Sequence, residues 1–499
     1  MALLSNCACT ETLALVLCVG IGIFAYFKWA FGYWKRKGVP YLKPSIPMGN
    51  MECPIIPKRS FAESVREWYS EAKRRGDKHV GLFIFSKPVY MPIDLELVRN
   101  VLVKDFDHFV DRGVFFNERD VLSLQLFSLE GSRWRNLRAK LTPTFSSGKL
   151  KTMFGMVAAC GRQMVKAMED KGGPIDIKDW AGRYGTDVIG TCAFGIECNS
   201  FQNPNSDFRR FSKRALLPTA WNSFKIFLAF TSKNLGRMLD IRITPDDVSG
   251  FFTKIVQDTI KYREENKVVR SDFLQILLDL RNATDESGHH LTVEEIVAQS
   301  FLFFLAGFET MSTAMTFCLY ELAVNVDLQE RVRDEVEAVL EAHNGELTHE
   351  AVAEMKYMKQ VIDESLRKYP PGSHLVRKCV ADYKVPGTDV TVERGTAVLV
   401  SVYGLHYDPE YFPDPERFDP DRFSEENRSK IGAYMAFGEG PRMCIGVRFA
   451  FLQLRVALAL LLKDFRFTVS EKTREPIQMN PQSLVLSVLG DIWLNIERI

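Results

Sequence analysis

The chain has 499 residues and a formal net charge of +1 at pH 7, so it lacks the basic excess that nucleic-acid binding requires. Its 10 cysteines are scattered, with no paired spacing beyond Cys7 and Cys9, which indicates a reducing compartment. No low-complexity linker, charge run or repeat follows residue 50. We therefore expect one large, mainly α domain with a minority β-sheet, preceded by an N-terminal transmembrane helix.

The amino end contains an uncharged apolar run from Leu13 to Phe27. If Lys28 snorkels to the interface, the run extends to Trp34 and is long enough to span a bilayer. Lys35–Lys37 follow it, whereas Glu11 is the only charge before it, so the positive-inside rule places everything after the anchor in the cytosol. A cleaved signal peptide is the alternative, but the basic n-region is missing and the apolar run is unusually long.

Prolines at positions 40, 44 and 47 predict a semi-rigid, extended connector after the basic segment. The chain thus divides into an anchor with its basic stop (1–37), a proline-rich hinge (38–50) and a single large domain (51–499). Strand-like patterns occur at His79–Met91, Asp382–Val392 and Thr396–Val402. Helical patterns occur at Ser147–Asp170, Ile175–Gly195, Pro245–Asn266 and Asp272–Asn282.

A Thr-x-x-Glu capping box at Thr292 opens a helix that is apolar almost all round, which predicts burial. Polar residues such as Gln299 interrupt the run, so we do not expect it to span a membrane. Gly307 lies mid-helix beside the acid–alcohol pair Glu309 and Thr310, and glycine there costs about 1 kcal/mol against alanine. Such a local cost often marks a functional position. The alternative is a core threonine that bonds back to its own helix.

Glu364 and Arg367 lie three residues apart in a helical pattern over Tyr357–Lys368, so they share one helix face. By itself such a pair is most often a solvated ion pair of little energetic value. The proline-rich stretch Phe412–Pro420 then supplies a further arginine, Arg417.

The most specific pattern surrounds Cys444, which lies in the spacing Phe-x-x-Gly-x-x-x-Cys-x-Gly. Gly438 and Gly440 can adopt backbone angles that turn amide groups toward the sulfur. Gly446 allows a flat ligand to approach the chain, and the helix that follows presents its positive end to the thiol. A lone cysteine is more often a buried structural residue, but this spacing favours a thiolate that ligates a metal.

Taken together, these motifs resemble the cytochrome P450 family, over essentially the full length of the chain. The segments WKRKGVP, FFLAGFET and FGEGPRMCIG are most similar to insect microsomal P450s of the xenobiotic-detoxification type. The resemblance implies a mainly α fold that holds haem b (iron protoporphyrin IX), with Cys444 as the axial thiolate ligand of the iron. It also implies a proline-rich connector and a site on the endoplasmic reticulum membrane, with the large domain on the cytosolic side.

The resemblance assigns further roles to matching positions. Thr310 and Glu309 would deliver protons for oxygen activation, and Gly307 would open a groove for dioxygen. Glu364, Arg367 and Arg417 would form a buried structural triad. Haem-binding positions would be Trp134 and Arg138 of a W-x-x-x-R pattern, with Arg377, Arg442, Phe437, Gly438, Gly446, Ala306 and Gly307. His374, close to Arg377, could contact the haem or be an ordinary loop histidine.

The segments that would line the substrate pocket contain few polar side chains, so we expect a roomy apolar pocket that orients ligands by shape. Its expected residues are Phe115, Phe116, Phe127, Phe304, Phe308, Leu375, Val376 and Leu484. Such a pocket fits lipophilic xenobiotics, with an endogenous lipid or hormone as the alternative. The stretch Leu216–Phe230 could dip into the bilayer or be a buried helix–loop.

The chain has no P-loop, dinucleotide fingerprint or iron–sulfur spacing, so electrons must come from a partner. The expected donor is the membrane-bound NADPH–cytochrome P450 reductase, with cytochrome b5 as a second donor. Basic residues that could meet it are Arg133, Arg135, Lys140, Lys149 and Lys151. Two alternatives remain: a haem-thiolate isomerase or dehydratase, against which the acid–Thr pair counts, and a non-catalytic haem sensor.

Overall fold

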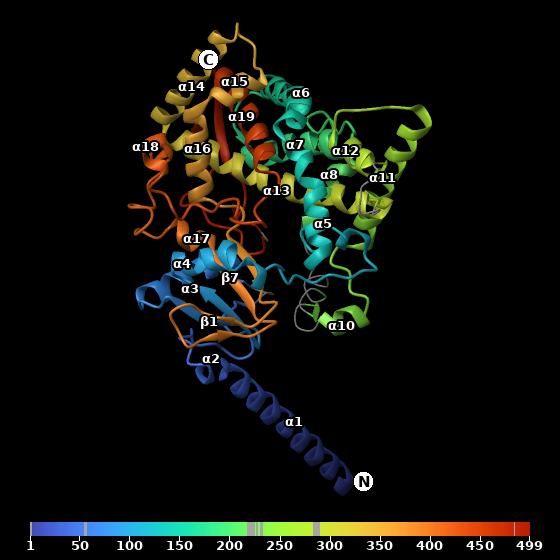
Figure 1. Cartoon of the computed structure of the whole chain (residues 1–499), viewed down its shortest axis with the longest axis vertical. Helices are drawn as coiled ribbons and strands as arrows, with labels where there is room; N and C mark the ends of the chain where they lie inside the picture. The colour runs from blue at the N-terminus through green and yellow to red at the C-terminus, as the bar shows by residue number, and fades with distance from the viewer. Residues whose placement is uncertain are drawn as a thin grey trace.

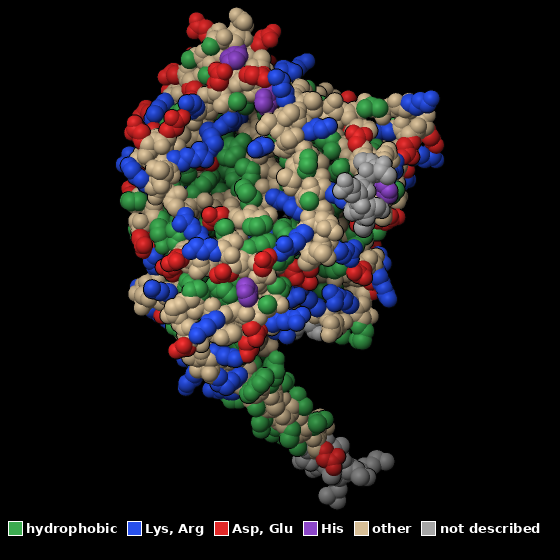
Figure 2. Space-filling model, viewed as in Figure 1, with side chains coloured by type: hydrophobic (Ala, Val, Ile, Leu, Met, Phe, Trp, Pro, Cys, Tyr) green, Lys and Arg blue, Asp and Glu red, His purple; other side chains and the backbone are tan. Residues whose placement is uncertain are grey.

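The computed structural model describes residues 2–53, 57–216, 225, 228–229, 233–282, 290–483 and 485–499. Helix α1 (Ala2–Phe31) projects away from the body of the molecule (Figure 1). Its segment Glu11–Phe31 has a mean hydropathy of 2.0 and the length to cross a membrane. Apolar side chains such as Leu13 and Ile21 are exposed along it. Figure 2 shows hydrophobic side chains along most of the described part of this helix.

The body is mainly α-helical. Its longer helices are α3 (Phe61–Arg74), α5 (Gly131–Leu141), α6 (Ser147–Lys171), α7 (Ile177–Ile189), α8 (Asp207–Leu216), α11 (Asp246–Asn266), α12 (Phe273–Asn282), α13 (Val293–Val324), α14 (Val326–Ala342), α16 (Lys356–Lys368) and α19 (Val447–Asp464). Shorter ones are α2 (Tyr33–Arg36), α4 (Leu95–Arg99), α10 (Lys233–Met238), α15 (His349–Glu354), α17 (Val402–His406) and α18 (Glu425–Arg428). All the helices predicted from sequence are present, although the pattern at 175–195 resolves into a short strand, α7 and a π-helical turn.

In the described part of the chain, three small sheets accompany the helices. The largest has the strand order β1-β2-β7-β4, with β2 and β7 parallel and the other pairs antiparallel. Its strands are β1 (His79–Ile84), β2 (Lys87–Pro92), β7 (Ala397–Ser401) and β4 (His374–Lys378). The others pair β3 (Ile175–Asp176), β9 (Trp493–Arg498) and β8 (Phe465–Val469), and β5 (Tyr383–Lys384) with β6 (Thr391–Val392). The three predicted strand regions are confirmed, whereas β3, β4, β8 and β9 were not predicted.

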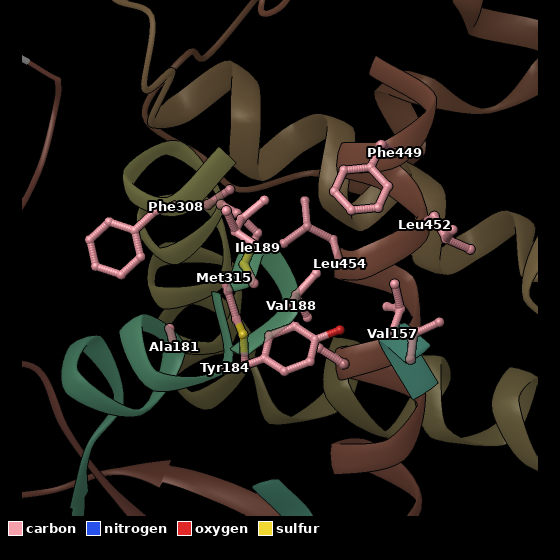
Figure 3. Packing of buried hydrophobic residues seen from close by; sticks show 14 of the residues in the cluster. Val157, Ala181, Tyr184, Val188, Ile189, Phe308, Met315, Phe449, Leu452 and Leu454 are labelled. Carbon is pink, nitrogen blue, oxygen red and sulfur yellow. The ribbon is translucent and has the colours of Figure 1, made fainter. Parts of the chain in front are cut away.

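Helix α13 runs through the centre of the body and packs against α7, α11, α16 and α19. Thr292 caps it, and Glu295 bonds back to the cap, as the capping box predicts. Although α13 is apolar enough to span a membrane, most of it is buried inside the protein. Figure 3 shows the core where α13 meets α6, α7 and α19, with Phe308, Met315, Tyr184 and Leu454 among its residues.

Candidate active site

The Cys444 loop is held in one shape by backbone hydrogen bonds. Cys444 N–H donates to Phe437 O at 2.9 Å, and Gly438 N–H donates to Met435 O at 2.9 Å. Gly438 and Gly440 have φ angles of 74° and 75°, where side chains are strained. A β-carbon on Gly440 would also lie 2.0 Å from a backbone oxygen of the π-helical turn that follows α4. Both predicted glycine positions are therefore required by the loop.

Cys444 is an exposed residue at the end of this loop, directly before α19. Burial raises the pKa of the Cys444 thiol, whereas the Gly446 N–H, Arg138 and Arg112 lower it. The amide lies at the start of α19, as the sequence predicted. Among the described residues no group of three or more His, Cys, Asp or Glu side chains could hold a metal ion.

Four arginines gather near this cysteine: Arg112, Arg138, Arg377 and Arg442. Arg377 and Arg442 are 2% and 3% exposed. Burial lowers the pKa of Arg377 to about 10. Burial, together with the charge of Arg377, lowers the pKa of Arg442 to about 9. Burial lowers the pKa of Arg112 further, with contributions from the other three arginines. The carboxylates beside Arg442 are those of Asp111, 3.9 Å away, and Glu130. Two carboxylates do not balance four clustered cations, which favours the binding of a further anion.

The donors of this cluster are not all used by the protein. Arg442 donates to Val110 O at 2.8 Å and to Leu129 O at 2.9 Å, and its guanidinium stacks over Trp134 at 3.9 Å. However, Arg377 Nε and Arg442 Nη1 are buried without a hydrogen-bond partner among the described residues. Buried unpaired donors of this kind are costly, which indicates that they bind a ligand. The predicted haem positions Trp134, Arg138, Arg377 and Arg442 thus lie together, and Arg112 joins them.

Arg112 was missed by the sequence reasoning. It lies in a loop without regular periodicity, and only the fold brings it to the other arginines. Its guanidinium stacks on Phe127 at 4.1 Å and donates to Arg442 O at 3.2 Å. By contrast, His374 pairs with Ser373 Oγ at 3.0 Å and packs against Phe61, and burial lowers its pKa to about 4.

One face of α13 is open where most of the helix is buried. Ala306 is exposed, and Leu302, Glu309 and Thr310 are half-buried. Leu302, Ala306 and Thr310 follow the i, i+4 spacing of a single helix face. This face of α13 is less covered by protein than the rest of the helix, and the sequence reasoning did not name Leu302, which lies on it.

Thr310 and Glu309 both lie at this face. Thr310 Oγ1 donates to Ala306 O at 2.5 Å, which is the back-bond considered as the structural alternative. The bond leaves the hydroxyl oxygen free to accept a hydrogen bond beside Ala306. Burial raises the pKa of Glu309, and the charge of Lys178 lowers it. The pair thus combines a fixed hydroxyl with a carboxyl group that binds a proton more readily than usual.

Gly307 is explained by helix packing. A β-carbon there would lie 2.6 Å from Ile189 Cδ1 and 3.2 Å from Ile189 Cγ1 on α7, so a larger residue would require the Ile189 side chain to move. Helix α13 continues unbroken past this position. No groove for dioxygen is needed to account for the glycine.

The structure corrects the predicted pocket at two positions. Phe304 and Phe308 point away from the Ala306 face and are 0% and 4% exposed. They stack on each other, and Phe304 stacks on Phe252 of α11. Figure 3 shows Phe308 in the core beside Ile189 and Ala181. They belong to the core, because a helix that is apolar all round gives no sign of which face is open.

The other pocket candidates lie in varied surroundings. Leu375 is beside the Cys444 loop, where its Cδ2 would lie 3.6 Å from a β-carbon on Gly438. Val376 is its half-buried neighbour on β4. Phe115 is buried against Ala229 and Ile241. Phe116 lies near the guanidinium of Arg133, and Phe127 is 45% exposed. Leu484 and most of the 216–230 stretch lie outside the described residues.

Behind the Cys444 loop, α16 holds a fully buried ion pair. Arg367 donates to Glu364 through Nε at 2.7 Å and Nη2 at 2.9 Å, and both side chains are 0% exposed. The prediction that Arg417 completes the triad is wrong. The side chain of Arg417 is exposed, and only its backbone carbonyl contacts the ion pair, by accepting a hydrogen bond from Arg367 Nη2. The arginine side chain that approaches the pair is Arg422, whose Nε lies 3.5 Å from Glu364 Oε1.

This ion pair is connected to the cysteine loop through one histidine. Arg367 Nη1 donates to the backbone carbonyl of His406 at 2.9 Å, and His406 Nδ1 pairs with Arg367 O at 3.0 Å. His406 Nε2 accepts from Met435 N–H at 2.9 Å, and Met435 in turn accepts from Gly438. Burial lowers the pKa of His406 to about 3, so the ring is neutral and can accept this bond. The pair therefore supports the loop that carries Cys444.

The outer side of the Cys444 loop opens into a hollow of about 500 Å³ between α16 and α19. Figure 2 shows its hydrophobic floor and the Lys and Arg side chains around it. Phe437, Gly438 and Met443 of the loop line it. Apolar residues of its wall include Leu150, Val352, Phe451 and Leu452. Its cations are Lys359, Arg428, Arg448 and Arg455, of which Lys359 is paired with Asp363, an acidic residue of the same lining.

Comparison with known proteins agrees with this site. A family model for cytochrome P450 matches residues 53–494. The chain is 40% identical to "Probable cytochrome P450 6a14" of Drosophila melanogaster, over 98% of this chain and 99% of that protein. It is 40% identical to "Cytochrome P450 6A1" of Musca domestica, with 97% and 98% covered. It is 38% identical to "Cytochrome P450 6k1" of Blattella germanica, with 99% and 98% covered.

The chain belongs to the cytochrome P450 family, and the three relatives named above are insect proteins, in agreement with the resemblance that the sequence motifs showed. It is therefore an oxidoreductase of the monooxygenase type, and its family implies a haem cofactor. The residues present fit that group. A cysteine held by glycine turns can ligate the iron, and buried arginine donors without protein partners can bind two carboxylates.

Proposed function

We propose that this P450 oxidises lipophilic foreign compounds, such as insecticides or plant compounds, with electrons that NADPH supplies through a reductase. The observation that carries the chemistry is the cluster of buried arginines with unpaired donors near Cys444. The substrate class is supported by the apolar face of α13 at Leu302 and Ala306 and by the similarity to insect P450s.

When bound, haem b supplies the activation of dioxygen. Cys444 would ligate its iron, and Trp134 with Arg112, Arg138, Arg377 and Arg442 would hold its propionates. The buried ion pair of α16 would keep the cysteine loop in place through His406. The role of the Ala306 face is to hold an apolar substrate and to exclude bulk water, while Thr310 and Glu309 carry protons.

The test of this function uses the full chain in lipid vesicles with NADPH, the reductase and a panel of lipophilic compounds. We expect substrate loss that requires both NADPH and the reductase, with one atom of labelled dioxygen in each product. Loss without NADPH would instead support an isomerase or dehydratase. Turnover of endogenous lipids alone would contradict the proposed substrate class.

Thr310→Ala should lower the amount of product per NADPH consumed, by about tenfold, and raise peroxide release. The reason is that the hydroxyl is expected to act on proton delivery, which general acid–base groups accelerate by 10²–10⁴-fold. Haem content and substrate affinity should change little, so the loss should appear in turnover. Thr316→Ala is a matched control, because Thr316 makes the same back-bond, to Ser312 O at 2.6 Å, in a buried part of α13. Equal coupling in both variants would make Thr310 a purely structural residue.

We propose that the reductase, and cytochrome b5 as a second donor, dock on the hollow behind the Cys444 loop. The hollow brings an apolar floor and a cationic rim next to Phe437 and Met443, so an acidic partner could approach the haem closely there. The arginines first considered for docking are already paired: Arg133 with Glu118 at 3.1 Å and Arg135 with Asp107 at 2.6 Å. Lys151 likewise pairs with Glu350. Arg448 is an exposed cation on the hollow itself.

Arg448→Glu should therefore slow reductase-supported turnover several-fold at low ionic strength, and less at high salt, because electrostatic steering is screened. Peroxide-supported turnover should stay near normal, since it needs no partner. Arg210→Glu, on α8, is the control, because that arginine is also exposed but does not line the hollow. Equal losses in the reductase and peroxide assays would place the damage in the haem site.

We propose that α1 anchors the protein in the endoplasmic reticulum membrane as a single span, with the catalytic domain in the cytosol. The support is the exposed apolar surface of Glu11–Phe31 and the basic segment Lys35–Lys37 that follows it.

A further inference from the structure

The segment that joins the anchor to the domain is packed as tightly as the core. Trp34, in α2, is 0% exposed, and its Nε1–H donates to Leu82 O at 2.9 Å. The indole lies over Gly81, where a β-carbon would come within 2.3 Å of Trp34 Cγ. Glycine at this position of β1 therefore makes the room that the tryptophan occupies.

The residues after Trp34 extend the sheet. Val39 N–H donates to Trp34 O at 3.0 Å, which folds the chain back over the indole. Gly81 N–H then donates to Pro40 O at 2.7 Å, and Leu42 N–H donates to Gly81 O at 3.1 Å. These bonds form a parallel bridge to β1. The proline-rich connector is thus fastened to the domain by its own backbone.

A second set of contacts holds the anchor from other sides. Tyr33 OH donates to Glu393 at 2.8 Å, and Lys37 forms an ion pair with the same carboxylate. The ring of Phe31, at the end of α1, packs against Phe83 of β1 with centroids 5.1 Å apart. Because Glu393 and Phe83 lie in separate parts of the domain, contacts to both of them prevent α1 from rotating about either contact.

We propose that residues 31–42, here called the anchor joint, fix the angle between α1 and the catalytic domain, so that one face of the domain is held against the lipid surface. This inference rests on the proposed membrane anchor. A flexible tether would let the catalytic domain rotate freely relative to the membrane. A joint fixed by Trp34 instead holds the end of the domain that carries β1 and α2 toward the lipid surface. Figure 1 shows that α10 lies at this same end of the body, and Met238 of α10 is 74% exposed.

The joint can be tested with trypsin on the full chain in vesicles of phosphatidylcholine and phosphatidylethanolamine. Lys35, Arg36 and Lys37 are exposed, but cleavage after them requires local opening of the joint. Mass spectrometry identifies released domain that begins at residues 36–38. Cleavage after Lys58 and Arg59, which are exposed and lie outside the joint, gives an internal standard in the same digest.

Gly81→Ala and Trp34→Ala should each raise the rate of cleavage within Lys35–Lys37 by at least about tenfold, because each displaces or removes a fully buried indole. Trp34→Phe keeps a ring but loses the hydrogen bond to Leu82, so it should raise the rate about threefold. Ile21→Ala is the control, since Ile21 is 67% exposed on α1, away from the joint, and should leave the rate unchanged. A normal carbon monoxide spectrum in each variant shows that the catalytic domain has folded.

Orientation is measured separately, with a fluorescent amino acid at position 238 and lipid-bound quenchers. The probe should be quenched in the wild type and lose at least half of that quenching in Gly81→Ala. A probe at position 337 of α14, which lies at the far end of the body in Figure 1, should not be quenched. The wild type and the variants should all pellet with the vesicles. If they then showed the same cleavage rate and the same quenching, the proposal that the anchor joint fixes the orientation of the domain would be wrong. A wild type that does not pellet would instead refute the membrane anchor.

Discussion

Cys444→Ser should abolish the strongly red-shifted Soret band that carbon monoxide gives with the reduced wild-type protein. That band reports electron donation from a thiolate to the iron, and a serine hydroxyl cannot provide it. The loss should be complete, whereas haem content should fall less, because the buried arginines that would hold the propionates remain. The measurement is a reduced carbon monoxide difference spectrum alongside a haem assay.

Cys379→Ser is the control for this prediction. Cys379 is buried two residues beyond Arg377, and its single S–H can donate to Ala381 O at 2.9 Å or to Val392 O at 3.4 Å, a choice that a serine hydroxyl also has. The band should persist in this variant. A band that survives Cys444→Ser would show that another cysteine is the ligand, and the proposed site would be wrong.

Local features of the site were readable from the sequence because each depends on neighbouring residues. The glycines around Cys444 predicted the left-handed turns that the loop adopts, and the capping box predicted where α13 begins. The spacing of Glu364 and Arg367 predicted an ion pair on one face of α16. Their complete burial could not be read from that spacing, since exposed pairs have the same spacing.

Features that depend on the path of the chain were not readable in the same way. Arg417 and Arg422 lie five residues apart in one proline-rich loop, and only the turn of the backbone decides which one meets Glu364. Arg112 joins the other arginines from a loop with no periodic pattern. The sheet order β1-β2-β7-β4 likewise brings together strands that are far apart in the sequence.

The open face of α13 is a third case. Hydrophobic periodicity identifies a buried face by contrast with a polar one, and α13 offers almost no contrast. Phe304 and Phe308 were therefore assigned to the pocket, although they face α7 and α11, whereas Leu302 on the Ala306 face was overlooked. Gly307 carried a clear signal of a special position, but the signal did not distinguish helix packing from an oxygen groove.

Glu364→Ala and Arg367→Ala should each yield little or no haem-loaded protein. Removing one partner of a buried ion pair leaves an uncompensated charge and costs about 3–5 kcal/mol, a large part of the stability of a typical domain. In this protein the damage should reach the Cys444 loop, since Arg367 holds the backbone of His406, which in turn accepts from Met435 N–H. The measurement is the ratio of haem to protein after purification, together with the thermal unfolding midpoint.

The two arginines of the proline-rich loop provide a matched comparison for the same assay. Arg422 is 13% exposed and lies beside Glu364, so Arg422→Ala should reduce haem loading to an intermediate level. Arg417 is exposed and contributes a backbone carbonyl that alanine retains, so Arg417→Ala should load haem almost normally. The opposite order, with Arg417→Ala the more damaging, would contradict the arrangement described for this triad. Normal loading of Glu364→Ala would show that the buried pair does not support the haem site at all.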